Sequence, residues 1–340
     1  MKKTLVALAV LAAAGSAQAI ELYNQDGVTV NLAGDIEVVY KQGIGVDEEM
    51  KQEIQDADFG FDVRYAVNDD LQFGGYWEFD GSADNGLLDN AAKAGNAYVA
   101  LYSQTAGSIK FGRLDSVLDD AGIGSDYQFG LSAFFSNNSP FGADESIRYD
   151  IDKGTFYGAL AYKQDKNQNS GLGQNGNMVD AKIGARVADF DATIFYGDSK
   201  FDGPNVQNGD ESLIAAELRY GGFENLNLEA GFYHLENQDD GAEKMKYDIF
   251  ALAADYTYNK FIFAGGLEFA SFDEATFQTG TNTTESQDKQ TGWFLNAGYL
   301  IAPGATIYAE VGGNDGYSQG NNNFYAKNDV GFAIGAKAEF

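Results

Sequence analysis

Charged side chains recur at alternate positions along apolar runs of this 340-residue chain. In one run, Asp58, Asp62 and Arg64 alternate with Phe59 and Phe61. This spacing places the charges on one face of a β-strand and the apolar groups on the other. Fixed charges of both signs do no covalent chemistry in this arrangement, but their field acts on ions in adjacent water.

The same alternation extends through most of the chain. Other ionisable residues with this parity are Asp35, Glu37, Glu78, Lys182, Arg186, Glu217, Arg219, Glu229, Asp255, Glu268, Glu310 and Lys337. So many charges cannot fill a dry core. We therefore expect them to face a wet lumen while the apolar face meets lipid, in a barrel wide enough to hold water.

About sixteen alternating runs are predicted to be strands. They lie at 28–40, 57–67, 71–80, 96–102, 107–113, 146–151, 155–163, 179–187, 190–199, 211–220, 226–236, 247–258, 261–270, 291–300, 305–312 and 329–340. Their lengths are close to the roughly 9–11 residues that a tilted strand needs to cross a bilayer. The connections are alternately short and long, an alternation that a soluble β-sandwich would not enforce.

These features predict an all-β fold: a 16-stranded antiparallel transmembrane β-barrel with short periplasmic turns, long external loops and one long loop folded into the lumen. An even strand count places both chain ends on the periplasmic side and the first strand beside the last. The final run, which ends at Phe340, would then have a partner on each edge and lipid on its apolar face.

The longest connection, residues 114–145, is unusually apolar for a loop. We expect it to pack on the inner barrel wall, narrow the passage and bring its acids into it. These acids are Asp115, Asp119, Asp120 and Asp126. The alternative is a long external loop with solvated surface acids.

The N-terminus predicts a cleaved signal peptide over residues 1–19. Lys2 and Lys3 precede a short apolar run, and Ala17-Gln18-Ala19 fits an A-x-A cleavage site, so the mature barrel would be one domain over 20–340. An N-terminal membrane anchor is the alternative, but the run is too short to span a bilayer.

The formal net charge of −29 excludes nucleic-acid binding through phosphates, and the absence of cysteine excludes disulfides and thiolate metal sites.

Three segments and the last residue carry a family resemblance. They are ELYNQDG at 21–27, LQFGGYWEF at 71–79, GSIKFGR at 107–113 and the terminal Phe340. The chain resembles the general diffusion porins of Gram-negative bacteria (the OmpC/OmpF type), in particular the OmpU-like branch of marine γ-proteobacteria. The resemblance implies a homotrimer of water-filled pores in the outer membrane, in contact with lipid and lipopolysaccharide. It also implies that Phe340 is an assembly signal for the barrel-assembly machinery.

The resemblance also implies a pore constriction in which basic wall residues face acids on the inward loop. Arg113 and Arg148 match two of the family's basic positions. Asp58 and Asp62 stand where the family has positive charges, and the stretch at 126–130 departs from its acidic loop motif. We therefore expect a channel that prefers cations and passes ions and small hydrophilic solutes, and we count Arg64, Asp115, Asp119, Asp120 and Asp126 among its candidate constriction residues.

Other functions require other features. An outer-membrane enzyme would need a base beside a nucleophile, but the single histidine, His234, lies on the outward parity. A sugar-selective channel would need a file of lumen aromatics, and the candidates are scattered: Tyr76, Tyr157, Phe195, Tyr233, Phe294 and Tyr308. An adhesin-like barrel or a soluble acidic adhesin is a further alternative, although the terminal strand disfavours the soluble form.

No cofactor is expected. Divalent cations could bridge acids on external loops to lipopolysaccharide phosphates, at 47–49 or at Asp239 and Asp240, although plain solvated charge is the simpler interpretation.

Overall fold

The computed structural model describes residues 19–82, 86–131 and 138–340. Residues 1–18 of the predicted leader (1–19) and residues 132–137 of the long loop lie outside these ranges. The first strands are β1 (Ile20–Gln25), β2 (Val28–Gln42), β3 (Lys51–Ala66), β4 (Leu71–Ser82), β5 (Leu88–Ser103), β6 (Gly107–Asp115), β7 (Gly142–Asp152), β8 (Phe156–Gln164) and β9 (Asn177–Val187). The others are β10 (Phe190–Phe201), β11 (Gly209–Phe223), β12 (Leu226–Asp239), β13 (Met245–Tyr258), β14 (Phe261–Gly280), β15 (Thr283–Ala302), β16 (Ala305–Asn314), β17 (Tyr317–Gln319), β18 (Tyr325–Lys327) and β19 (Val330–Glu339).

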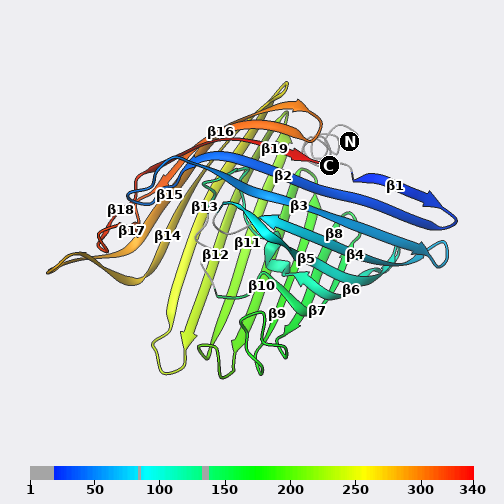
Figure 1. Cartoon of the computed structure of the whole chain (residues 1–340), viewed down its shortest axis with the longest axis horizontal. Coiled ribbons are helices and arrows are strands. Elements are labelled where there is room, and N and C mark those ends of the chain that lie inside the picture. Colours follow the sequence, from blue (N-terminus) through cyan, green and yellow to red (C-terminus); the bar gives the residue numbers. More distant parts are fainter. Residues whose placement is uncertain (1–18, 83–85, 132–137) are drawn as a thin grey trace.

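Sixteen of these strands form a closed antiparallel ring that runs from β2 through β16 to β19 and back to β2 (Figure 1). The last strand, β19, pairs with β16 on one edge and with β2 on the other. Gly34 and Phe340 exchange two backbone hydrogen bonds of 2.8 and 2.9 Å. The predicted barrel and the two-sided pairing of its last strand are therefore confirmed.

A short strand, β1, extends the closure. Along one edge, β2 pairs with β3 over nearly its whole length. Its other edge pairs with β1 from Val28 to Leu32 and with β19 from Asp35 to Gln42. The two chain ends therefore share one edge of β2 and leave Gly34 between them.

The described residues contain one short 3₁₀ helix, η1 (Val117–Asp120), in the long loop. No helix among them is long and apolar enough to cross a membrane.

The external end of the barrel differs from the prediction. Residues 271–290, expected to be a loop, instead continue β14 and β15 as a projecting hairpin. Apolar and polar residues do not alternate regularly at its tip, so the sequence pattern did not predict strands there. Ring contacts hold it against β17 and β18: Phe277 stacks on Tyr317 at 4.7 Å between centroids and meets Tyr325 at 5.5 Å.

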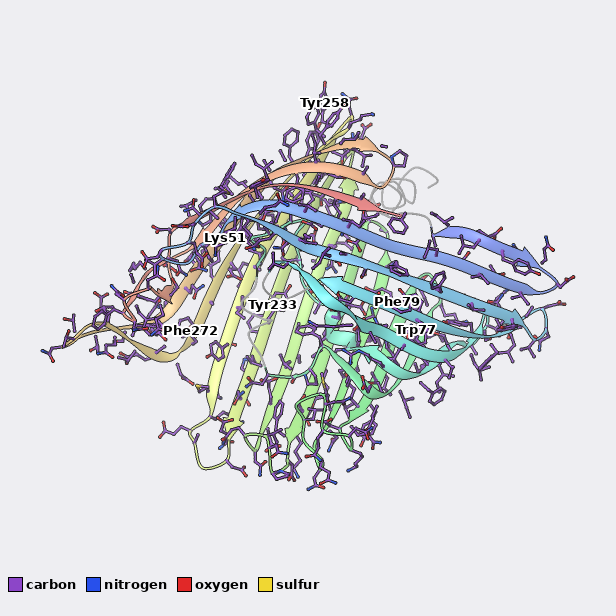
Figure 2. All side chains as sticks on the ribbon, viewed as in Figure 1. Lys51, Trp77, Phe79, Tyr233, Tyr258 and Phe272 are labelled. Carbon is purple, nitrogen blue, oxygen red and sulfur yellow. The ribbon has the colours of Figure 1, made fainter. Side chains whose placement is uncertain are left out.

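The outward face of the barrel is apolar, as the alternation predicts. Ile183, Phe156 and Ile334 each expose more than half of their surface in the isolated chain. Figure 2 shows Trp77 and Phe79 on β4, where their ring centroids lie 4.6 Å apart. An apolar surface this continuous needs an apolar medium, and the hydrocarbon layer of a membrane supplies it.

Gly34 offers a test of the close contact between β2 and β3. A β-carbon on Gly34 would lie 2.3 Å from the Asp58 carbonyl oxygen and 2.7 Å from the Phe59 Cα, so Gly34→Val would force β2 and β3 apart. We expect a loss of roughly 1–3 kcal/mol of unfolding free energy, the usual cost of overpacking. Urea unfolding of the refolded barrel in detergent measures it.

Gly75→Val is the matched control, because a β-carbon at this position would have the Tyr98 carbonyl oxygen, at 3.4 Å, as its nearest neighbour. Equal stability of the two variants would contradict the role of Gly34.

Candidate functional site: the lumen and its inward loop

The long loop begins after β6 and packs on the inner wall through an apolar surface. Its residues Leu118, Ala121 and Ile123 belong to a buried cluster with wall residues of β10 to β14. The wall members of that cluster include Phe195, Leu213, Ala215, Tyr233, Leu235, Ile249, Ala251, Ala253 and Ala270. One side of the lumen is therefore dry and filled by the loop.

Wall carboxylates hold the backbone of this loop. The Val117 N–H donates to Asp180 at 2.5 Å, and the Gly122 N–H donates to Glu217 at 2.5 Å. Farther along, the Gly124 N–H donates to Glu229 at 3.3 Å. At the returning end, the N–H groups of Asn138 and Ser139 donate to Glu211, each at 3.0 Å. Because the described part of the loop before β7 has no regular secondary structure beyond η1, these side chains supply acceptors that a helix or sheet would otherwise provide.

Glu310 on β16 makes the densest of these contacts. It accepts the backbone N–H groups of Tyr127 at 2.6 Å, Gln128 at 2.9 Å and Phe129 at 2.5 Å. The side-chain amide of Asn296 donates to it as well, at 3.0 Å. Glu310 is only 1% exposed. A buried carboxylate is tolerated when charge-assisted hydrogen bonds surround it, and here the loop backbone provides most of them.

A cross-strand contact anchors the loop near the chain ends. The side-chain amide of Gln128 donates to Glu37 at 2.8 Å and to the Tyr308 hydroxyl at 3.1 Å. The Tyr127 ring stacks on Tyr308, with centroids 4.0 Å apart. The loop thus reaches from β9 along the inner wall to β2.

Two wall cations hold η1. Asp120 accepts from Arg148 Nη2 at 3.0 Å and from Lys182 Nζ at 2.7 Å. Arg148 also donates to the Ser116 carbonyl oxygen at 3.2 Å and to Asp150 at 2.9 Å. The structure therefore brings together Arg148 and Asp120, two of the candidate constriction residues.

Asp115 and Asp119 lie beside that pair, since the Asp115 carbonyl oxygen accepts from Arg148 at 3.4 Å and Asp119 precedes Asp120 in η1. The other candidates lie apart from it. Arg113 contacts Asp144 on β7 at 2.7 Å, and Asp115 accepts the side-chain amide of Asn96. Asp62 contacts Arg64 at 2.7 Å. Asp119 is exposed on η1, and Asp126 is exposed in the loop.

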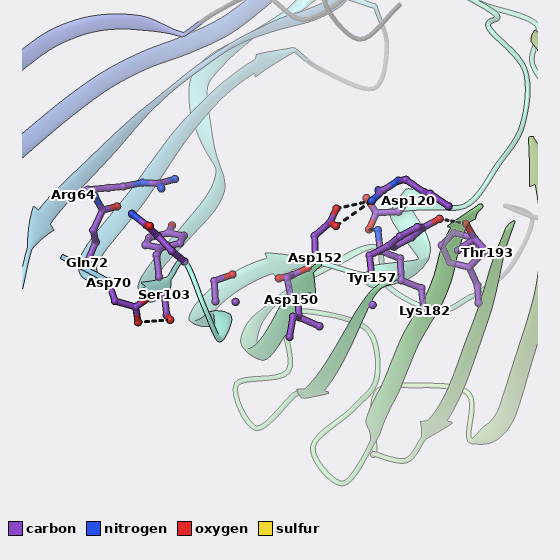
Figure 3. Close-up of a pocket in the computed structure, with 18 of the residues that line it drawn as sticks. Arg64, Asp70, Gln72, Ser103, Asp120, Asp150, Asp152, Tyr157, Lys182 and Thr193 are labelled. Carbon is purple, nitrogen blue, oxygen red and sulfur yellow. Dashed lines mark hydrogen bonds and ion pairs between the residues drawn. The ribbon is translucent and has the colours of Figure 1, made fainter. Parts of the chain in front are cut away.

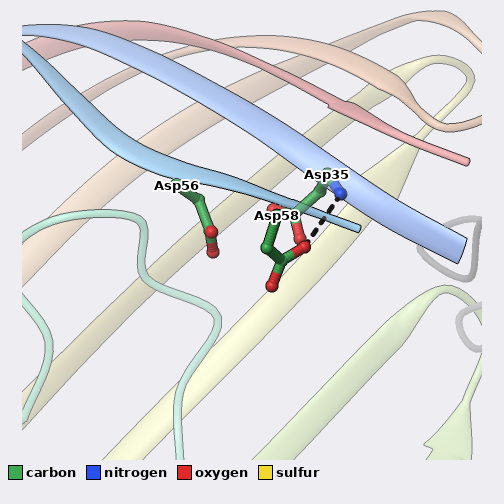
Figure 4. Close-up of side chains that lie close together, drawn as sticks. All are labelled: Asp35, Asp56 and Asp58. Atoms are coloured by element: carbon green, nitrogen blue, oxygen red, sulfur yellow. Dashed lines mark hydrogen bonds between the residues drawn. The ribbon is translucent and has the colours of Figure 1, made fainter. Parts of the chain in front are cut away.

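Asp58 belongs to a carboxylate group that the sequence pattern did not identify in full. Its side chain and those of Asp35 and Asp56 bring ligand-type oxygens within 4.8 Å of one another (Figure 4). The Asp35 N–H donates to Asp58 Oδ1 at 3.2 Å. Lys337 on β19 lies beside the group, 3.2 Å from Asp35 and 3.2 Å from Glu339. We call Asp35, Asp56 and Asp58 the acidic triad.

The triad was missed for two reasons. Asp56 falls one residue before the predicted start of its strand, whereas β3 begins at Lys51. Asp35 lies directly opposite Asp58 because of the way β2 and β3 are aligned. The alternation within a single strand does not reveal how that strand is aligned with its neighbour.

Most lumen aromatics lie beneath the loop rather than along a passage. Phe195, Tyr233, Phe294 and Tyr308 are each less than 5% exposed. Tyr76 donates to Glu78 at 3.1 Å. The arrangement offers no continuous stacking surface for sugar rings among these four buried residues.

The residues considered as a catalytic base and as a divalent-cation site lie toward the external end of the barrel. The His234 ring contacts Asp248 at 2.7 Å and Glu236 at 3.5 Å, so its neighbours are carboxylates. Asp47 accepts the Asn321 N–H at 3.1 Å, and Glu48 contacts Lys51 at 3.3 Å.

A closed barrel with a lipid-facing exterior, charged lumen and inward loop defines an outer-membrane channel protein. The chain belongs to the Gram-negative porin family, whose model matches residues 4–319. It lies in the outer membrane of a Gram-negative bacterium, and its relatives support the OmpU-like branch.

Two curated relatives and two solved structures illustrate the similarity. Porin-like protein H of Photobacterium profundum is 28% identical, over 93% of this chain and 95% of that protein. Outer membrane protein U of Vibrio parahaemolyticus is 28% identical, over 100% of this chain and 86% of that protein. The trimer form of OmpT from Vibrio cholerae has a TM-score of 0.71 at 19% identity, covering 93% of this chain and 100% of that chain. An anion-selective porin from Comamonas acidovorans has a TM-score of 0.70 at 15% identity, and the match covers 92% of this chain and 100% of that chain.

Glu310→Gln tests how the loop is held. The substitution keeps the shape but removes the charge that three loop N–H groups share, and hydrogen bonds to charged groups each contribute about 1.5–3 kcal/mol. We expect residues 127–129 to loosen, so that single-channel current in a planar bilayer becomes larger and noisier than in the unmodified protein.

Glu274→Gln, on the exposed hairpin, makes the same chemical change away from the lumen. Equal current noise in both variants would show that Glu310 does not hold the loop.

Proposed function

We propose that the protein is a water-filled channel that prefers cations and passes ions and small hydrophilic solutes by passive diffusion. The observation that carries the sign of this preference is the acidic triad. Three carboxylates converge there, and one of them, Asp35, contacts a cation, Lys337. Their summed field favours cations in the adjacent water.

We place the passage between the loop and the wall that begins at β2. Two observations support this route. The loop packs on the opposite wall, where its apolar side chains exclude water. The wall carboxylates Glu217 and Glu310 are buried by the loop backbone, whereas the triad is only partly buried.

Arg64 on β3 and the two wall cations that contact η1 are paired and add little opposing field. Arg148 and Lys182 share Asp120, and Arg64 contacts Asp62. Paired charges largely cancel at a distance, so the triad dominates the field along the proposed passage. The fold itself does not set the sign of selectivity, since an anion-selective porin has the same architecture.

The other parts of the proposal rest on family membership. A homotrimer is supported by the trimeric form of a structural neighbour. A cleaved leader ending at Ala19, assembly through Phe340, and contacts with lipid and lipopolysaccharide fit an outer-membrane porin. The porin family and fold also support a channel without enzymatic activity. Calcium or another divalent cation at the external acids remains a prediction from their clustering.

Neutralising the triad tests the sign of selectivity. A charge about 10 Å from an ion in water changes the energy of the ion by about 0.4 kcal/mol, which corresponds to roughly a factor of two in local concentration. We therefore expect Asp35→Asn, Asp56→Asn and Asp58→Asn together to lower the K⁺/Cl⁻ permeability ratio several-fold. Lys337→Gln should raise it by about twofold. Reversal potentials under a KCl gradient measure both changes.

Asp240→Asn, which removes one negative charge from an exposed external loop, is the control for charge removal away from the lumen. A triple variant whose reversal potential equals that of this control would refute the proposal that the triad sets the preference.

A further inference from the structure

A second region of the lumen has a different electrostatic character. Below η1, a cavity of about 680 Å³ is lined by residues from β3 to β11 and by the turn residue Gln104 (Figure 3). Because that turn and the end of β7 at Asp152 are on the periplasmic side, the cavity opens toward the periplasm. We call it the periplasmic vestibule.

The vestibule carries balanced charges rather than an excess of acid. Its lining cations are Arg64, Lys182, Arg186 and Arg219, and its lining acids are Asp70, Asp120, Asp150 and Asp152. A solute with one net charge meets attraction and repulsion there in similar measure. A solute that carries both charges a few bonds apart can contact both kinds of group.

Two arginines in the vestibule are fixed in similar ways. Arg64 contacts Asp62 at 2.7 Å, and its guanidinium carbon lies 4.0 Å from the centroid of the Tyr102 ring. Arg186 contacts Asp152 at 2.9 Å and lies 4.1 Å from the centroid of the Tyr157 ring.

Carboxylates and the face of one ring hold each guanidinium in place, since Arg186 also contacts Asp191 at 3.3 Å. Their side chains are nevertheless 35% and 43% exposed, so each retains accessible N–H groups. A planar, fixed guanidinium is well suited to bind a carboxylate, because less side-chain freedom is lost on contact.

Accessible carboxylates complement the arginines. Asp70 accepts the Ser103 hydroxyl at 2.7 Å and the Thr105 N–H at 3.0 Å. These hydrogen bonds, the one from Ser103 first, hold the pKa of Asp70 below its usual range, so it stays ionised in mildly acidic medium. Asp152 is 55% exposed beside Arg186. Both can accept an ammonium group.

Stacked arginines disfavour a sugar site. A sugar ring binds by lying on an open aromatic face, but one face of Tyr102 and one face of Tyr157 are already covered by a guanidinium. Eight of the residues that line the cavity are charged, and ionic partners fit these groups better than hydroxyl groups do.

We propose that the periplasmic vestibule is a weak binding site for zwitterionic solutes, namely amino acids and short peptides. The solute carboxylate contacts Arg64 or Arg186, and its ammonium group contacts Asp70 or Asp152. Binding is weak because each new contact competes with an existing ion pair. This inference rests on the proposed function in one respect, since solutes must be able to enter the lumen. It adds a preference for zwitterionic solutes, which a general preference for cations does not give.

Single-channel recording with trialanine on the periplasmic side tests the site. Zwitterionic trialanine should interrupt the current for times about fivefold longer than N-acetyl-trialanine amide, which has no charge. This ratio corresponds to two exposed ion pairs of ordinary strength. The two singly capped peptides, one anionic and one cationic, should give interruptions closer to those of the uncharged peptide.

Two variants assign the effect to the arginines. Arg64→Gln and Arg186→Gln together should shorten the trialanine interruptions to those of the uncharged peptide. Lys289→Gln, which removes one positive charge from the exposed external hairpin, should leave them unchanged. The conductance of each variant without peptide shows that it has folded and opened.

Equal interruptions by zwitterionic and uncharged trialanine would overturn the proposal. So would a double arginine variant that behaves like the unmodified protein, or a singly charged peptide that blocks as long as the zwitterion. Failure of the proposed function is distinguishable from these results, because it appears as absent conductance or inverted reversal potential before any peptide is added.

Discussion

The contact between wall carboxylates and the loop backbone is the interaction on which the lumen depends. A backbone segment inside a barrel must find hydrogen-bond acceptors that water or regular structure would otherwise supply. Asp180, Glu211, Glu217 and Glu310 provide them, and each is nearly or fully buried. The dependence is mutual, since these charges would be costly to bury without the loop N–H groups. Loop position and wall charge are therefore determined together.

That constraint gives the lumen two unlike sides. Where the loop packs, acids serve as structural acceptors and apolar side chains exclude water. Near β2 and β3, the acidic triad is only partly buried, with Lys337 as the contacting cation. Farther toward the periplasm, opposite charges are balanced around a cavity. A single count of acidic and basic residues would miss this division, since the position of the loop decides which charges act on solutes.

Strand periodicity predicted the barrel well, because each lipid-facing residue must be apolar and its neighbours must not. It also predicted that the apolar loop packs inside. Periodicity could not distinguish acids that accept hydrogen bonds from the loop from acids whose charge acts on ions in the passage. Glu217 and Glu310 share the inward parity of Asp58, and only the three-dimensional path of the loop separates them. It missed Asp56 because strand boundaries are the weakest part of a periodic signal. The long β14–β15 hairpin was missed because its tip, outside any lipid, has no apolar face.

Cysteine accessibility tests the central claim, that the water-filled passage follows the acidic wall and the opposite wall is dry. The chain has no cysteine, so single substitutions can be labelled without background. Asp58→Cys and Leu213→Cys would each be treated with a charged methanethiosulfonate reagent during bilayer recording. We predict that the reagent reduces the current of the Asp58→Cys channel and leaves that of the Leu213→Cys channel unchanged. Modification at position 213 with none at position 58 would contradict the account.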